Sequence, residues 1–179
     1  MEALITELRG LTNAGTADYS VVGQAYWTDE QLQNRLDQRR SDIKFYELAP
    51  IEEYASGAYV YKDYPIPYKY IERDVDVLDF QGNAYGTALY SVDYDRGMVS
   101  FVADTGGAAV YINAAVYDLY RAAADVWRQK AAHVASRYDV KTDNQTLTRS
   151  QLIGNFMQMA QVYESMAGPQ QVQVFRSDE

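Results

Sequence analysis

The feature that most constrains the fold is a pair of amphipathic helices near the end of the chain. Apolar residues recur at helical spacing from Ala114 to about Tyr138, and again from Thr148 to about Ala167. The second stretch opens with a capping box, Thr148 to Gln151, whose first and last residues can satisfy each other's backbone amides. The linker between the stretches, residues 139–147, is too polar to bury and too long for a tight turn. These helices carry packing faces and no catalytic group.

The first 43 residues predict two further helices. Residues 2–11 form a short one with an apolar side. Thr28-Asp29-Glu30-Gln31 is a second capping box, and Trp27 precedes it as a hydrophobic staple toward Leu32. Leu36 and Ile43 extend the buried side of this helix. Packed on the last two helices, these segments predict a bundle of about four helices.

Residues 44–111 have a different pattern from the rest of the chain. Here apolar and polar residues alternate, whereas the apolar residues of the flanking segments recur at helical spacing. Apolar and polar residues alternate from Tyr90 to Tyr94, Asp95-Arg96-Gly97 turns the chain, and alternation resumes to Phe101, which predicts a hairpin. A strand with a turn at Gln81-Gly82-Asn83 is expected before it. Tyr64-Pro65-Ile66-Pro67-Tyr68 cannot lie in a central strand, since two amides are missing.

The segments together predict an α+β fold, a helical bundle with an inserted small antiparallel β domain. Residues 1–43 and 112–167 would form the helical core, residues 44–111 the insertion, and residues 168–179 an extended tail. The 179-residue chain is long enough for one good core and a small second one.

Charge and composition exclude several functional classes. The net charge of −9 argues against a surface that binds nucleic acid, because phosphate binding needs a basic patch. The insertion has five basic against eleven acidic residues, so most of the acidity belongs to it. There is no cysteine, and hence no disulfide framework or thiolate site. The acidic N-terminus does not read as a signal peptide, and no apolar run is long enough to span a membrane.

No residue pattern predicts catalysis, a cofactor or a metal. His133 stands alone in a helix without a catalytic partner. Asp74, Asp76 and Asp79 can be read as metal ligands, but their alternation with valines favours the solvent face of a strand. Arg39-Arg40 fits either an acidic or nucleic-acid partner or a solvated helix end. Thr105 to Ala108 lacks a phosphate-loop ending and is expected to lead into the helix, with Asn113 as its N-cap.

Two sets of residues are candidates for protein contacts. Five tyrosines crowd around the two prolines and could form an interface or a sugar-binding surface: Tyr59, Tyr61, Tyr64, Tyr68 and Tyr70. The tail alternates with β period after Gly168-Pro169, and can add to a sheet edge of a portal or an adjacent subunit through Gln171, Val172, Gln173, Val174, Phe175 and Arg176.

The two ends of the chain also resemble a known family. An alanine-rich helix ends in Tyr138-Asp139, a linker with Thr142-Asp143-Asn144-Gln145-Thr146 follows, and Arg149-Ser150-Gln151 opens a last helix carrying Tyr163. Near the start, residues 25–33 read Ala-Tyr-Trp-Thr-Asp-Glu-Gln-Leu-Gln. These stretches resemble the head-tail connector proteins of tailed bacteriophages, also called adaptor or head-completion proteins.

The resemblance implies a structural virion protein and not an enzyme. It implies a ring of about twelve copies below the portal protein, a closed symmetric assembly, which extends the DNA channel and carries the next neck or tail-completion protein. Genomic DNA would pass through the lumen without specific binding. The protein would lie in the virion neck, after assembly in the host cytoplasm.

The inserted β domain departs from this family, whose minimal members are mostly helical, so the resemblance assigns it no role. The alternative function is a module that binds carbohydrate or a host surface through the tyrosine-rich β domain.

Overall fold

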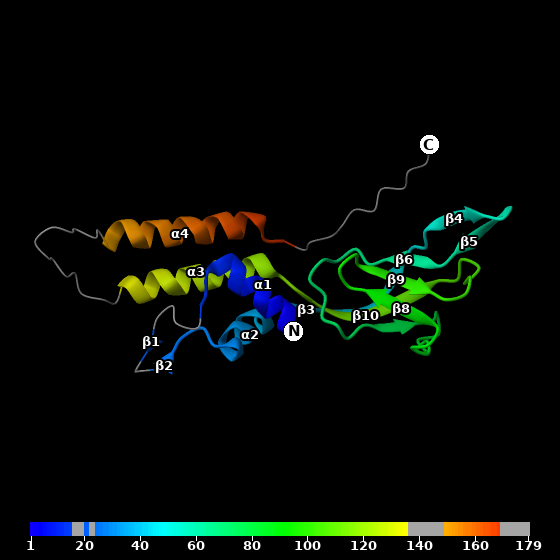
Figure 1. The fold of residues 1–179 in the computed structure, drawn as a ribbon, viewed down its shortest axis with the longest axis horizontal. Helices are drawn as coiled ribbons and strands as arrows, with labels where there is room; N and C mark the ends of the chain where they lie inside the picture. Colours follow the sequence, from blue (N-terminus) through cyan, green and yellow to red (C-terminus); the bar gives the residue numbers. More distant parts are fainter. Residues whose placement is uncertain (16–19, 22–23, 136–148, 169–179) are drawn as a thin grey trace, which may run out of the picture. The chain divides into compact units, whose positions relative to one another are not determined.

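The computed structural model describes residues 1–15, 20–21, 24–135 and 149–168. The α+β prediction is confirmed: the chain forms helices near both ends and small antiparallel sheets mainly between them. The chain divides into two compact units, and the ribbon in Figure 1 distinguishes them as a helical and a β part. The helical unit comprises Met1–Arg39 and Asp118–Gly168, and the described part of the β unit is Arg40–Tyr117.

The helical unit is organised around its longest buried helix. Its helices are α1 (Glu2–Thr12), α2 (Asp29–Asp37), α3 (Leu119–Ala135) and α4 (Arg149–Met166), and α3 contacts the other three. A short pairing of β1 (Ser20–Val21) with β2 (Gln24–Ala25) lies between α1 and α2 in sequence. Burial follows the apolar stripes of the sequence, with Leu8, Leu32, Leu36 and Leu119 fully buried.

The described part of the β unit, Arg40–Tyr117, contains three small antiparallel sheets. One has the order β3 (Arg40–Leu48), β10 (Val110–Tyr117), β7 (Asp76–Leu78), and another has β6 (Asp63–Pro65), β9 (Met98–Phe101), β8 (Tyr90–Asp93). The third is the hairpin of β4 (Glu52–Ala55) and β5 (Ala58–Tyr61). Apolar residues of the first two sheets and of the segments directly beside them form one core: Leu48, Tyr64, Ile66, Val75, Val77, Val99, Phe101, Val110, Ile112 and Ala114.

Several local predictions are confirmed. Thr28 and Gln31 form the capping box of α2, with the Thr28 side chain accepting from the Gln31 amide. The hairpin predicted around Asp95-Arg96-Gly97 is β8–β9. The turn at residues 81–83 is held by the Asp79 carboxylate, which accepts from the Gln81 and Asn83 amides. Pro65 lies in β6, an edge strand, where no partner needs its missing amide.

Two predicted helix boundaries are wrong. Ala114 to Tyr117 belong to β10 and not to the helix, which begins at Leu119, and Ile43 lies in β3 and not in α2. Alanine favours helices, but here the central position of β10 between β3 and β7 overrides that preference. Asn113 therefore caps no helix, and Asp118 does so instead, its carboxylate accepting from the Arg121 amide.

The unit boundaries shift accordingly. The helical unit ends at Arg39 and resumes at Asp118, where the sequence placed the limits at residues 43 and 112. Thr148, the predicted cap of the last helix, lies outside the described residues. Within the described part of the chain, no helix is long and apolar enough to cross a membrane.

The helical unit should fold without the β unit. The Asp118 amide donates to the Arg39 carbonyl at 3.0 Å, so the two ends of the excised segment are adjacent. We expect a chain in which a short glycine linker replaces residues 40–117 to keep its helical circular dichroism and a cooperative thermal transition. Loss of both signals would show that the helices depend on the β unit.

Candidate interaction surfaces

The structure separates the five candidate tyrosines. Tyr59 is 60% exposed, and Tyr61 and Tyr68 are half-buried. Tyr64 and Tyr70 are buried, at 0% and 7% exposure, so their prediction as interface residues is wrong. Tyr64 is buried because it belongs to the core of the β unit, where its hydroxyl donates to the Ala108 carbonyl at 2.9 Å and pairs with the Thr105 hydroxyl.

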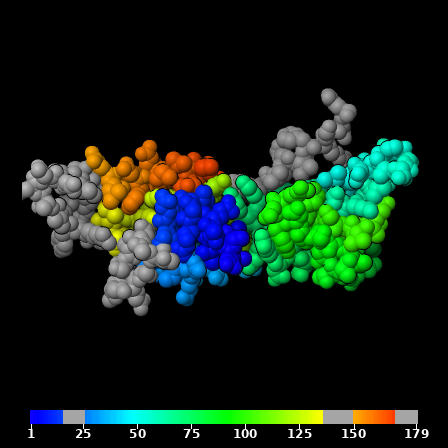
Figure 2. All heavy atoms as spheres, in the orientation of Figure 1, coloured from blue at the N-terminus to red at the C-terminus, as the bar shows by residue number. Residues whose placement is uncertain are grey.

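The most exposed tyrosine pair lies on the β4–β5 hairpin. Tyr54 is 67% exposed and is paired directly with Tyr59, the two rings meeting edge to face at 5.3 Å. Figure 1 shows this hairpin projecting beyond the other strands of its unit, and Figure 2 shows it as a cyan protrusion. Tyr54 is not among the five tyrosines predicted from the sequence, although the Ser56-Gly57 turn between alternating residues marks this hairpin.

The base of this hairpin is held by a loop after β9. The Asp104 carboxylate accepts from the amides of Tyr61 and Gly106, both at 2.9 Å. These two backbone hydrogen bonds lower the pKa of Asp104 below its usual value. The Tyr61 carbonyl accepts from both the amide and the hydroxyl of Thr105. The hairpin is thus anchored at its base and open at its tip.

An exposed aromatic stack lies on the β3–β10–β7 sheet. Phe45 stacks on Tyr111 with ring centroids 4.2 Å apart and planes 4° from parallel, and it is 45% exposed. A register shift between β3 and β10 places Phe45 at φ 51°, a left-handed conformation that bulky residues rarely adopt. The Asn113 side chain stabilises it by accepting from the Phe45 amide at 2.9 Å.

The helix α4 has an apolar flank that is partly exposed to solvent. Among the residues of this helix whose burial is described, 150–166, only Ala160 is fully buried. Phe156 packs on Trp127 and Tyr163 on Tyr120, so these side chains mark the side facing α3. Met159, Val162 and Met166 are 36–46% exposed and follow one another at the spacing of one helix side. We call these three residues the α4 flank.

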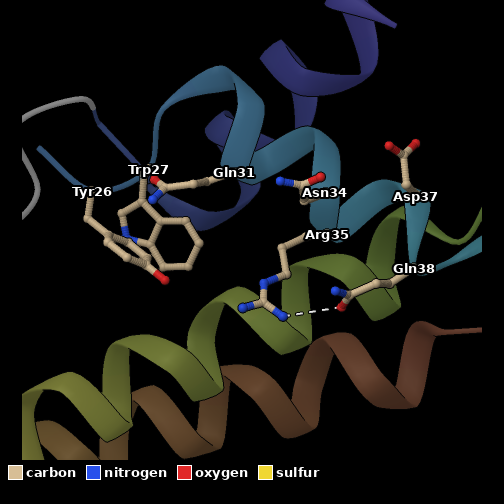
Figure 3. A pocket seen from close by; sticks show the side chains of 7 residues that line it. All are labelled: Tyr26, Trp27, Gln31, Asn34, Arg35, Asp37 and Gln38. Carbon is tan, nitrogen blue, oxygen red and sulfur yellow. Dashed lines mark hydrogen bonds between the residues drawn. The ribbon is translucent and has the colours of Figure 1, made fainter.

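A polar groove of about 530 Å³ lies along α2. Figure 3 shows it lined by Tyr26, Trp27, Gln31, Asn34, Arg35, Asp37 and Gln38. The positively charged side chain in this groove is Arg35. Its guanidinium is bonded within the protein, because it donates to Gln38 at 3.2 Å and to Gln129 of α3 at 2.6 Å. Gln129 in turn donates to the Tyr26 hydroxyl. This network braces α2 against α3.

The residues considered for catalysis, metal binding or contact with an acidic or nucleic-acid partner lie in ordinary structural positions. His133 is half-buried on α3, and Asp74 and Asp76 are exposed beside the buried Val75 and Val77. Arg39 forms an ion pair with Asp125 at 2.7 Å, and Arg40 one with Asp42 at 2.7 Å. Among the described residues, no cluster of His, Cys, Asp or Glu is arranged to hold a metal ion. Residues 171–176 of the predicted docking tail lie outside the described residues.

Comparison of the chain with models of known protein families finds no match, and comparison with curated protein sequences also finds none.

Proposed function

We propose that this protein is a structural subunit of a tailed-bacteriophage neck, a head-tail connector that forms a ring beneath the portal protein. The observation that carries the proposal is the α4 flank. Each subunit of a ring needs a lateral contact in which one surface meets a different surface of its neighbour. A stripe of methionine and valine beside the packed side of a helix suits such a contact, because methionine adapts its shape to the opposing surface.

Much of the rest of the α4 surface is polar, which favours a specific contact between subunits over non-specific aggregation. The side of the helix away from α3 carries Gln158, Gln161 and Ser165, all exposed and polar. The apolar area is therefore a narrow stripe and not a whole helix face. The net charge of −9 opposes association of free subunits. We expect a monomer or small oligomer in solution, and a ring of about twelve copies once a portal organises the subunits.

Substitution of the α4 flank tests this proposal. The variant Val162→Glu adds a charge to the stripe without touching the side that packs on α3, so folding should be retained. We expect this variant to attach to portal-bearing heads at least about tenfold less than the unmodified chain, about 1.4 kcal/mol at the contact. Attachment is measured by co-sedimentation, and rings by negative-stain electron microscopy.

The matched control is Ser165→Glu, which places the same charge on the polar side of α4. It should attach like the unmodified chain, and both variants should keep the same melting temperature within experimental error. Equal attachment of all three proteins would contradict a role of the α4 flank. Absence of attachment by the unmodified chain would contradict the connector function itself.

A second candidate function is recognition of carbohydrate or of a host surface by the β unit. The exposed Tyr54–Tyr59 pair favours it, because tyrosine offers a large contact area with little entropy to lose. A glycan-binding assay with the full chain and with Tyr54→Ser tests it. Glycan binding that this substitution removes would support recognition over assembly.

A further inference from the structure

The β4–β5 hairpin is a two-stranded sheet without a third strand. Its strands are joined by the turn Ser56-Gly57, with φ values of 54° and 88°, and within the described residues neither strand pairs with another. An isolated two-stranded hairpin is only marginally stable in water. A third strand would therefore both satisfy backbone groups and order the hairpin.

The two edges of this hairpin are not equivalent. Residues along an antiparallel strand direct their backbone groups alternately to one side and the other. The Ile51 amide donates to the Asp63 carbonyl, on the side of β5 and β6, so Glu53 and Ala55 also face β5. Glu52 and Tyr54 consequently direct their amides and carbonyls outward.

The outer edge of β5 is closed at its base. The Tyr61 amide is bonded to Asp104, and the Tyr61 carbonyl accepts from Thr105. Among the described residues, no further strand pairs with β4, and no loop backbone bonds to the amides or carbonyls of Glu52 and Tyr54. The edge of β4, from Glu52 to Tyr54, is therefore the open one.

The side chains of this edge select the partner. Glu52 shares a face with Tyr54, Tyr59 and Tyr61, and Glu53 lies on the opposite face, so both faces of β4 are acidic. Residues 51–61 contain no lysine or arginine, and residues 40–117 have six basic against twelve acidic residues. Edge strands are often protected from pairing by lysine, proline, a bulge or other charged side chains. Between Glu52 and Ala55, β4 carries no lysine or proline, and its charges, Glu52 and Glu53, oppose another acidic edge but not a basic strand.

Charge also disfavours a second copy of the hairpin as the added strand. Two β4 edges would place glutamates opposite glutamates, and like charges directly opposite each other destabilise a strand pair. A strand with arginine or lysine at alternate positions would instead meet Glu52 or Glu53, and arginine could also stack on the exposed tyrosine rings.

We propose that the β4 edge docks an extended basic segment of a partner protein, which adds to the hairpin as its third strand. Main-chain hydrogen bonds to Glu52 and Tyr54 supply the affinity, and the glutamates and tyrosines supply the specificity. This surface lies in a different unit from the α4 flank and does not depend on the connector function.

The test uses the full chain and a short synthetic peptide of alternating arginine and valine. Binding is followed by NMR, with hydrogen exchange of the Glu52 and Tyr54 amides as the readout. Saturating peptide should slow exchange at these two amides by about tenfold or more, as expected when open amides enter a ladder. The same peptide with alternate backbone amides N-methylated keeps its charges but cannot pair, and should not slow exchange.

Two variants separate backbone pairing from charge. Glu52→Pro removes an outward amide, which an edge strand tolerates, and should abolish binding while the cross-strand contacts of Tyr54 with Tyr59 persist. Glu52→Gln removes only the charge and should weaken binding several-fold, more at low than at high salt. Glu47→Gln, which neutralises an exposed glutamate on β3, is the matched control and should bind normally.

Three results would overturn the proposal. One is equal binding of the N-methylated and unmodified peptides, which would indicate charge attraction alone. Another is tighter binding of a peptide in which glutamate replaces arginine. The third is perturbation confined to the Phe45–Tyr111 stack, which would place the docking surface on the other sheet.

Discussion

Replacing Trp127 by alanine should lower the free energy of unfolding by about 3–5 kcal/mol, the range for removing a large buried ring. Trp127 is only 6% exposed and lies between α3 and α4, with its ring 5.4 Å from that of Phe156. The Lys130 ammonium lies 5.0 Å from the centre of the same ring. The alanine variant leaves a cavity at this contact between α3 and α4. Chemical denaturation followed by helical circular dichroism at 222 nm measures the loss.

Two controls make this expectation specific. Trp127→Phe keeps a ring at the contact and should cost clearly less, because the indole N–H of Trp127 has no hydrogen-bond partner among the described residues and its loss forfeits none. Met157→Ala changes a 39% exposed residue of α4 and should stay within about 0.5 kcal/mol of the unmodified chain. A nearly neutral Trp127→Ala would mean that α3 and α4 do not pack as described.

Replacing Tyr64 by alanine should destabilise the β unit by about 3–5 kcal/mol, as for other large aromatic side chains in a core. Tyr64 has no exposed surface, and its ring packs edge to face on Phe101 at 5.6 Å. Its hydroxyl links β6 to Thr105, which in turn bonds the base of the β4–β5 hairpin. Near-ultraviolet circular dichroism and NMR of the β unit should therefore show loss of structure at lower denaturant concentration. Tyr59→Ala, at 60% exposure, is the control and should be nearly neutral.

Alkaline pH provides an independent check on Tyr64. Burial raises the pKa of Tyr64, an effect that the hydrogen bond with Thr105 only partly offsets. A raised pKa means that the neutral phenol is favoured in the folded state. Its contribution to stability is therefore present below the unfolded pKa of about 10 and is lost as the pH rises through the folded pKa. Tyr64→Phe should lose less stability above pH 10 than the unmodified chain, and an equal loss would contradict the assignment.

The candidate surfaces were only partly predictable from the sequence. Tyr59 was identified from the density of tyrosines and is exposed, but the same density included Tyr64 and Tyr70, which are buried. A tyrosine beside a proline has the same local pattern whether its ring faces solvent or a core. The sequence predicts the last helix and its apolar residues, but not that the α4 flank stays exposed. The spacing of apolar residues does not say which side of a helix its neighbour covers.

Short-range interactions explain what the sequence by itself determined. The Thr28–Gln31 capping box, the β8–β9 hairpin and the Asp79 turn each involve residues close together in the chain, so their patterns predict their structures. The order of helical and β segments follows from the change in hydrophobic period from 3.6 to 2.

Long-range pairing explains what only the tertiary structure decided. Ala114 to Tyr117 are strand because β3, more than 60 residues earlier, pairs with them. Tyr64 is buried because Thr105 and Ala108 lie across the core, and the loop at Asp104 bonds the outer edge of β5 and not that of β4. Each of these outcomes depends on hydrogen bonds and packing between segments distant in sequence, whose free energy exceeds the local preference of the residues involved.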